Sequence, residues 1–352
     1  MTDPIAAAAK NDAAKHSNAL SPNKVALQSS GPAKPAELRA VWRKELRATF
    51  QLAWPLIIAQ IAQMSLNTTD VVMMGWLGAD FLGAGSLTMA IFHPIFLFGV
   101  GTITAVAALV AQAKGARDIK GVRRSVRQGL WVAMLLSIAL VPLTLQTGNF
   151  LRWTGQEPHI VALAQSYANA VAWIYPPAMA FMVLRAFVSA QGATSVILWV
   201  TVMGFFTNIV LNYGLMFGNW GLPRWELYGA GIATVLVDAL MMAMLYLYIH
   251  RHKQFRRYHI LVRLWRPDWA RFRDILRVGL PVGFMLLAET GLFAAAAMMM
   301  GWLGTYQLAG HAIALQCAAL TFMVPLGLSQ ATTIRVGLAY GRKDVAGIGV
   351  AA

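Results

Sequence analysis

The chain has 352 residues, of which 58% are hydrophobic and only 12% are charged, and its formal net charge is +15. A soluble domain of this size needs about a quarter of its residues charged, so this composition excludes a soluble protein and predicts a surface in contact with membrane lipid. The basic residues form short clusters between apolar runs, which is typical of membrane topology and does not favour a nucleic-acid partner. The single Cys317 excludes an intrachain disulfide and a cysteine-based metal cluster.

The N-terminal segment differs in composition from the rest of the chain. Residues 1–45 are rich in Ala, Lys, Ser and Pro, as in "AAAAKNDAAKHSNALSPNK". They contain no apolar core of the length found in cleaved signal peptides. We therefore predict a disordered cytoplasmic tail over 1–45 that acts as a solvated tether.

Apolar runs of about 20 residues or more occupy the remainder, and each is long enough to cross a ~30 Å hydrocarbon core as a helix. No blocks of residues alternate with the period of two that membrane strands require. The sequence therefore predicts an all-α polytopic membrane protein with about eight transmembrane helices. The predicted spans are 47–75, 84–113, 127–147, 160–190, 194–217, 229–250, 274–301 and 310–340.

The basic clusters fall in alternate connections. They lie before the first span, after the second ("KGARDIKGVRRSVRQ"), after the sixth, and at the end of the eighth ("YGRKD"), whereas the other connections carry few cations. Cytoplasmic loops are enriched in Lys and Arg, so we predict a cytoplasmic N-terminus in a bacterial-type plasma (inner) membrane. The aromatic and Arg-rich segment 253–273 is predicted to be a cytoplasmic interfacial linker.

The motif "MMGWLG" occurs twice, with Gly75 in the first copy and Gly301 in the second, an offset of 226 residues (301 − 75). The same offset pairs Pro55 with Pro281 without a gap. Six spans separate equivalent points, so the copies have the same orientation and form a parallel repeat, as in transporters. We predict a six-helix N-lobe over 46–252 and a partial, two-helix C-lobe over 274–352.

Apart from Asp274, the first residue of the seventh span, only three acidic residues lie inside the predicted spans: Asp70, Asp238 and Glu289. A charged side chain at the centre of a membrane helix costs at least ~2.5–3.5 kcal/mol, so such residues usually face a cavity or a partner. These three carboxylates are therefore the first candidates for a functional site.

Asp70 ends a polar stripe on the first span. Gln60, Gln63, Asn67 and Asp70 are spaced by three, four and three residues, which places them on one helical face. The stripe is either a wall of a cavity, lined by Gln63 and Asn67, or a polar seam between helices. A carboxylate is a costly choice for a seam, which favours a role for Asp70 in function. The second repeat has Ala296 at the equivalent position.

Two further helices carry oxygen atoms at the depth of Asp70. Asn208 and Asn212 lie four residues apart on the fifth span, and Thr234 and Asp238 lie four apart on the sixth. At ~1.5 Å per residue, Asp70, Asn212 and Thr234 are each about 8–9 Å inside the outer boundary, with Asp238 one turn deeper. Such a cluster could bind Na⁺ through Asp70 and Asn208, or carry a proton on Asp70. Interhelical hydrogen bonds are the alternative role for the Asn and Thr side chains.

Several stretches resemble the multidrug and toxic compound extrusion (MATE) transporters of the NorM type. They are "LAWPLIIAQIAQMSLNTTDVVMMGWLGADFLGAGSL", "LRAFVSAQGAT", "TNIVLNYGLMFG", "ELYGAGIAT" and "LRVGLPVGFMLLAETGLFAAAAMMMGWLG". The resemblance implies a cation-coupled antiporter of twelve helices that exports organic cations. It also implies a coupling role for Asp70, Asn208, Asn212 and Thr234 in the first lobe, and for Glu289 in the second. Because this chain has eight spans, we expect it to be truncated at the C-terminus.

We therefore expect a secondary active antiporter that exchanges organic cations for Na⁺ or H⁺, with no cofactor other than that coupling ion. The alternatives are a non-transporting fragment of such a protein and a lipid-linked precursor flippase, which would need a strongly cationic cavity. A membrane enzyme would need a metal-binding motif such as H-x-x-x-H or an activated nucleophile in its spans, and the sequence has none.

Two further features concern conformation. Arg185 and Arg335 lie five residues from the cytoplasmic ends of their spans and are expected to extend to the interface, with a gate contact or pairing with an acidic residue as the alternative. Pro176 and Pro177 are expected to break the fourth span, either as a hinge or as a tolerated irregularity.

Overall fold

The computed structural model describes residues 35–221, 223–260, 267–303 and 305–351, and within these ranges every regular element is a helix. The chain divides into two units, residues 1–47 and 48–352, and all contacts below lie within the second. The longer α-helices are α3 (Pro35–Leu77), α4 (Ala79–Gly115), α5 (Ile119–Leu145), α7 (Pro158–Val171), α8 (Tyr175–Ala190), α9 (Thr194–Phe217), α10 (Glu226–Arg251), α12 (Trp269–Leu303) and α13 (Thr305–Gly341). The short elements are α6 (Thr147–Trp153), η1 (Ala172–Ile174), η2 (Asn219–Gly221), α11 (Lys253–Arg256) and α14 (Val345–Ala351).

The predicted boundaries at the N-terminus and the linker need correction. Residues 1–34 of the predicted tail lie outside the described residues, but 35–45 belong to helix α3. This segment begins with a proline, which suits the first turn of a helix, and continues with strong helix formers. The predicted linker is also too long, because α12 already begins at Trp269.

Within the described ranges, seven helical segments are long and apolar enough to cross a membrane, and they match the second to eighth predicted spans. The first predicted span, 47–75, lies in α3, which is not one of the seven. Its polar stripe, which ends at Asp70, lowers its mean hydropathy. The same residues that make α3 a functional candidate thus make it the least apolar of the long helices.

The fourth span is broken where expected. It consists of α7, the 3₁₀ turn η1 and α8, with Pro176 and Pro177 in the first turn of α8. Neither proline has an N–H group to bond the carbonyl four residues earlier, at Ala172 and Trp173. The regular α-helical ladder therefore stops at η1 and resumes in α8.

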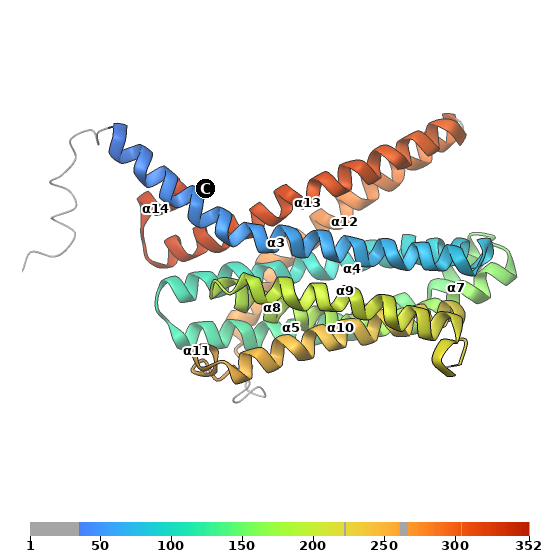
Figure 1. Cartoon of the computed structure of the whole chain (residues 1–352), viewed down its shortest axis with the longest axis horizontal. Coiled ribbons are helices and arrows are strands. Elements are labelled where there is room, and N and C mark those ends of the chain that lie inside the picture. Colours follow the sequence, from blue (N-terminus) through green and yellow to red (C-terminus); the bar gives the residue numbers. More distant parts are fainter. Residues whose placement is uncertain (1–34, 222, 261–266, 304, 352) are drawn as a thin grey trace, which may run out of the picture. The chain divides into compact units, whose positions relative to one another are not determined.

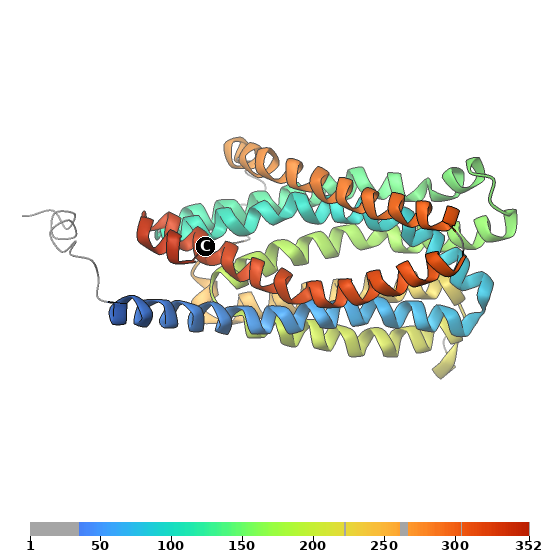
Figure 2. The same ribbon diagram turned by 90° about the horizontal axis from the view of Figure 1, so that it is seen from above.

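Helix α4 is central to the second unit, because it packs against α5, α7, α8, α12 and α13. Helices α9 and α10 pack against each other, and α10 also packs against α7 and α8 (Figure 1). Large side chains of α8, including Phe181 and Phe187, are fully buried in this core. The first repeat therefore forms one closely packed helical lobe, and Figure 2 shows its long helices running alongside one another.

The two repeats meet through contacts that the repeat relates to each other. A Cβ atom on Gly101 of α4 would lie 2.8 Å from the Cα of Gly283 on α12. A Cβ on Gly327 of α13 would lie 2.9 Å from the Cα of Ile57 on α3. Gly101 and Gly327 are equivalent under the repeat, as are Ile57 and Gly283. The same contact is thus made twice, as across the two-fold axis of an isologous dimer.

A second pair of contacts follows the same rule nearer the helix ends. Gly115 packs against the backbone of Leu338, and Gly341 packs against the backbone of Gln112. Gly115 is the repeat equivalent of Gly341, and Gln112 is that of Leu338. The parallel repeat predicted from the sequence therefore also appears as a two-fold symmetry of the interface between the two copies. The interface contains small residues, which allow the helices to approach closely.

This interface occupies one end of the repeats. It involves Gly279 and Gly283 of α12 and Gly327 and Gly341 of α13. The other halves of both helices expose large apolar side chains, namely Phe284, Met285, Leu292, Phe293, Met299, Leu303, Tyr306, Ile313, Leu320, Phe322 and Val324. The closed end is the one that carries the basic connections near Arg117 and Lys343. Figure 1 shows α12 and α13 diverging from α4 toward the opposite end.

Candidate functional site

Asp70 is buried in the N-lobe, where three side chains from two other helices donate hydrogen bonds to its carboxylate. The Nδ2 atoms of Asn208 and Asn212 on α9 lie 3.0 and 2.6 Å from Asp70 Oδ1. The hydroxyl of Thr234 on α10 lies 3.4 Å from Asp70 Oδ2. The asparagines are fully buried, and only 6% of Asp70 and 8% of Thr234 are exposed. We call these four residues the Asp70 cluster.

The hydrogen bonds of the Asp70 cluster are distributed unevenly. Oδ1 of Asp70 accepts from both amides, while Oδ2 receives only the long contact from Thr234, whose hydroxyl also lies 2.9 Å from the carbonyl of Ala230. The buried Oδ1 of Asn212 has no partner among the described residues. Each of these oxygens has lone pairs to spare. The cluster can therefore offer Asp70 Oδ2, Asn212 Oδ1 and the Thr234 hydroxyl to a proton or a small hard cation.

Close packing of α9 on α10 brings the donors together. A Cβ on Gly229 of α10 would lie 2.5 Å from the carbonyl oxygen of Leu215 on α9, and a Cβ on Gly204 of α9 would lie 2.6 Å from Met241 Sδ on α10. These glycines flank the Asp70 cluster along the pair of helices. Their missing side chains let α9 and α10 approach, so that Asn212 and Thr234 both reach Asp70.

Two other polar groups lie near the cluster. Asp238 on α10 is only 8% exposed, makes none of the hydrogen bonds found among the described residues, and interacts electrostatically with Asp70. Tyr167 on α7 is fully buried, is also within the field of Asp70, and its hydroxyl has no partner in the described part of the chain. Sequence reasoning missed Tyr167, and the only available signal was one phenol in an Ala-rich helix.

The remaining candidates lie apart from the Asp70 cluster. Glu289 is exposed on the diverging half of α12, Asn67 is exposed and Gln63 is half-buried on α3. Thr201, which lies seven residues before Asn208 on α9, donates to the carbonyl of Ile197 in its own helix at 2.9 Å. The structure thus joins Asp70, Asn208, Asn212 and Thr234 by hydrogen bonds and leaves Gln63, Asn67 and Glu289 outside that group.

The expectation that Arg185 extends to the interface is wrong. Its side chain is only 7% exposed, and its Nη2 atom donates to Gln60 Oε1 at 2.7 Å and to Gln330 Oε1 at 3.0 Å. Gln60 is on α3 and Gln330 is on α13. Two amide oxygens solvate the guanidinium inside the protein, so the side chain has no need to reach water.

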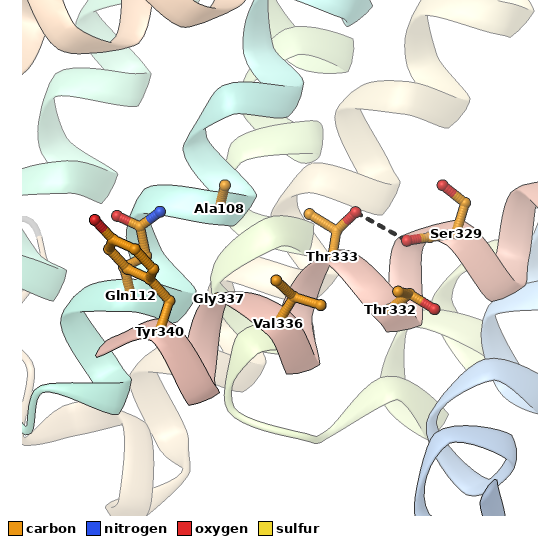
Figure 3. A pocket seen from close by; sticks show the side chains of 8 residues that line it. All are labelled: Ala108, Gln112, Ser329, Thr332, Thr333, Val336, Gly337 and Tyr340. Carbon is orange, nitrogen blue, oxygen red and sulfur yellow. Dashed lines mark hydrogen bonds between the residues drawn. The ribbon is translucent and has the colours of Figure 1, made fainter. Parts of the chain in front are cut away.

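A groove of about 550 Å³ lies between α4 and α13 and is distinct from the Asp70 cluster (Figure 3). Within it the hydroxyl of Thr333 bonds the carbonyl of Ser329 in the same helix at 2.9 Å. Its lining residues are Ala108, Gln112, Ser329, Thr332, Thr333, Val336, Gly337 and Tyr340. None of them is a carboxylate, so within the described residues the candidate for cation coupling remains the Asp70 cluster.

Transition-metal sites usually combine several His, Cys, Asp or Glu ligands, and the described ranges hold no group of three such residues. The oxygens around Asp70 belong to a carboxylate, an amide and a hydroxyl. These are ligands of hard cations, so they suit Na⁺ or a proton.

The MatE family model matches residues 55–214 and 281–352. The chain belongs to the MatE family. The two matched segments begin at Pro55 and Pro281, the residues that the internal repeat pairs. MatE membership and the apolar helices make this chain a multi-pass membrane protein of the MATE transporter family.

Curated relatives of this MatE chain include proteins described as probable multidrug resistance protein NorM. The one from Rhizobium meliloti (strain 1021) is 44% identical over 87% of this chain and 66% of its own length. The one from Agrobacterium fabrum (strain C58 / ATCC 33970) is 43% identical over 86% of this chain and 65% of its own length. The chain thus spans slightly less than two thirds of these relatives.

Solved MATE structures share the fold of this MatE chain. The eukaryotic MATE transporter AtDTX14 has a TM-score of 0.79 at 21% identity, covering 88% of this chain and 68% of that one. An outward-facing multidrug resistance MATE family transporter of the MOP superfamily has a TM-score of 0.77 at 24% identity, covering 87% and 67%. At these identities the likeness concerns the fold alone.

Proposed function

We propose that this protein takes part in multidrug efflux as a secondary active antiporter, which exports organic cations in exchange for Na⁺ or H⁺. The observation that supports this most is the Asp70 cluster: a buried carboxylate that has three hydrogen-bond donors and an oxygen left for a cation. The NorM description of its relatives adds the substrate class, drugs, to the proposal.

The proposed coupling step is a change of charge at Asp70. An ionised Asp70 accepts charge-assisted hydrogen bonds from Asn208 and Asn212, and such bonds are about twice as strong as neutral ones. Binding of a proton or Na⁺ at Oδ2 neutralises the carboxylate and weakens those bonds. Helix α3 is then free to move relative to α9 and α10. Coupling requires only that bound ion and bound drug disfavour each other.

Several other residues complete the proposal. Asp238 lies within the field of Asp70 and is proposed to raise the local affinity for cations. Gln63, Asn67 and Glu289 are proposed to line the cavity that holds the drug, since they are polar side chains on helices α3 and α12 that the cluster does not use. An acidic cavity favours cationic cargo over the diphosphate that a lipid-linked precursor flippase would bind.

Location and orientation follow from charge. The closed end of the repeats carries the basic connections, which the positive-inside rule assigns to the cytoplasm. We infer an inner-membrane protein whose N-terminus is cytoplasmic and whose diverging end opens outward. A fragment without transport activity is the alternative that a functional assay has to exclude.

The test is drug susceptibility of cells that express the wild-type protein or the variant Asp70→Asn. The variant keeps the size of the side chain but loses the charge, so we expect loss of drug resistance. Asp80→Asn is the matched control, because Asp80 is exposed near the start of α4 and, in the described part of the chain, its one ion pair is with the exposed His159, at 3.7 Å. Resistance retained in Asp70→Asn would remove Asp70 from the mechanism.

A further inference from the structure

Arg185 is the one basic residue of α8 and is only 7% exposed, and none of the ion pairs among the described residues involves it. Its Nη2 atom instead donates to the side-chain oxygens of Gln60, at 2.7 Å, and Gln330, at 3.0 Å. A buried guanidinium held by two neutral amides is unusual, because the desolvation of a charge is normally offset by a carboxylate. The choice of partners therefore calls for a physical reason.

The two hydrogen bonds of Arg185, which we call the Arg185 bridge, together cross the boundary between the repeats. Gln60 and Arg185 belong to α3 and α8 of the first repeat lobe, whereas Gln330 belongs to α13 of the second. Gln330 lies one turn after Gly327, and Gln60 lies one turn after Ile57, the pair whose backbones approach closely across the interface. The hydrogen bonds of Arg185 thus lie beside the closed end of the interface.

The bridge does not follow the two-fold symmetry of the interface. The repeat equivalents of Gln60 and Gln330 are Leu286 and Thr104, and neither carries an amide. The hydroxyl of Thr104 bonds the carbonyl of Gly101 in its own helix, at 2.5 Å. Symmetric glycine contacts therefore bring the repeats together, and the asymmetric hydrogen bonds of Arg185 are added to them.

Helix α3 connects this bridge to the Asp70 cluster. Gln60 and Asp70 lie on the same polar stripe, ten residues or about 15 Å apart along the helix axis. A movement of α3 that accompanies cation binding at Asp70 would therefore also move Gln60, which orients the guanidinium of Arg185. This gives the cluster a mechanical route to the interface between the repeats.

We propose that Arg185 is a gating residue, whose hydrogen bond to Gln330 holds the repeats together at the closed end and breaks each time that end opens. This proposal rests on the proposed transport function. A charged donor makes the bond stronger than one between two amides, and a neutral acceptor keeps it weaker than a buried ion pair. A gate needs this intermediate strength, because it has to close firmly and still open in every cycle.

The experiment measures the distance between the repeats by pulsed electron spin resonance. Spin labels replace the exposed residues Val210 on α9 and Ile313 on α13, with Cys317→Ser as background. We expect Arg185→Gln to raise about tenfold the ratio of the population of molecules with the shorter label-to-label distance to the population with the longer one. A change of this size is what the loss of one charged hydrogen bond produces. We expect Gln330→Glu, which creates an ion pair with Arg185, to lower that ratio and to slow drug efflux by a similar factor.

Further variants separate gating from a general loss of structure. Thr333 lies one turn beyond Gln330 on α13. The variant Thr333→Val removes only a hydrogen bond within that helix, so it should leave the label-to-label distances unchanged. Arg185→Lys should restore part of the wild-type distribution, because it keeps the charge. If Arg185→Gln does not fold, Gln330→Leu breaks the same bond from the half-buried partner and should raise the short-distance ratio.

The distance measurement requires no transport, so the two proposals can fail separately. Distance distributions in Arg185→Gln, Gln330→Leu and Gln330→Glu that match that of Thr333→Val would overturn the gate, whatever the efflux activity. If the distances shift in the Arg185 and Gln330 variants while Asp70→Asn shows normal efflux, the gate is supported and the proposed coupling site is overturned.

Discussion

At the scale of single residues, the Asp70 cluster was largely predictable from the sequence. Spacing placed Asn208 and Asn212 on one face of a helix, and counting from the helix ends placed Asn212 at the depth of Asp70 and Thr234. The hydrogen bonds confirm that these four side chains meet. The sequence could not show which oxygen stays free, because that depends on the rotation of each helix about its axis.

The first prediction moves the negative charge within the cluster. Asn212 Nδ2 lies 2.6 Å from Asp70 Oδ1, so the double variant Asp70→Asn/Asn212→Asp keeps one carboxylate and the same number of heavy atoms at almost the same point. We expect it to recover part of the drug efflux that Asp70→Asn alone loses. The measurement is the initial rate of drug efflux from loaded cells, and equal rates in the single and double variants would contradict a role for the charge itself.

A matched measurement addresses stability. Neutralising a buried charge removes a desolvation cost, so Asp70→Asn should melt no lower than the wild type in detergent. Asn212→Ala instead leaves a buried carboxylate with one donor fewer and should destabilise the protein by about 1–3 kcal/mol. The opposite order of melting temperatures would show that Asp70 serves the fold rather than transport.

At the scale of elements, hydropathy located the spans well and located their ends poorly. The break at η1 followed from Pro176 and Pro177, since the loss of N–H groups is a local property. The contacts of Arg185 were not predictable, because its partners Gln60 and Gln330 are 125 and 145 residues away in the sequence. An Arg near the end of a membrane helix ordinarily extends to the interface, and only tertiary structure reveals otherwise.

The glycines of α13 give a prediction with an internal control. A side chain at Gly327 would meet the backbone of Ile57, whereas a Cβ at Gly310 would meet nothing within 4 Å. Gly327→Leu should therefore separate the repeats and lower the melting temperature strongly. Gly310→Ala should raise stability by up to about 1 kcal/mol, because alanine favours the helix. Thermal unfolding in detergent distinguishes them, and equal effects would contradict the close interface at Gly327.

At the scale of the whole second unit, the 226-residue offset read from the sequence reappears as symmetric contacts between the repeats. Gly101 and Gly115 of the first repeat each approach a backbone of the second, and their equivalents Gly327 and Gly341 each approach a backbone of the first. The charge that distinguishes the repeats, Asp70 against Ala296, lies away from this interface. The duplication thus accounts for the architecture, and a few unpaired substitutions account for the proposed chemistry.

The orientation of the protein in the membrane is testable with two exposed positions. Trp153 is 84% exposed in the connection after the third span, and Val345 is 81% exposed after the eighth. In the Cys317→Ser background, Trp153→Cys should react with a membrane-impermeant maleimide on intact cells, whereas Val345→Cys should react only after lysis. The reverse labelling pattern would contradict a cytoplasmic N-terminus.

The central claim is that a cation at Asp70 drives drug movement. The most direct measurement is drug accumulation in proteoliposomes under a Na⁺ gradient and a pH gradient imposed one at a time, with wild type and Asp70→Asn compared. The account predicts that one of the two gradients drives accumulation by the wild type and that neither drives it in the variant. Gradient-driven accumulation by Asp70→Asn at the wild-type rate would contradict it.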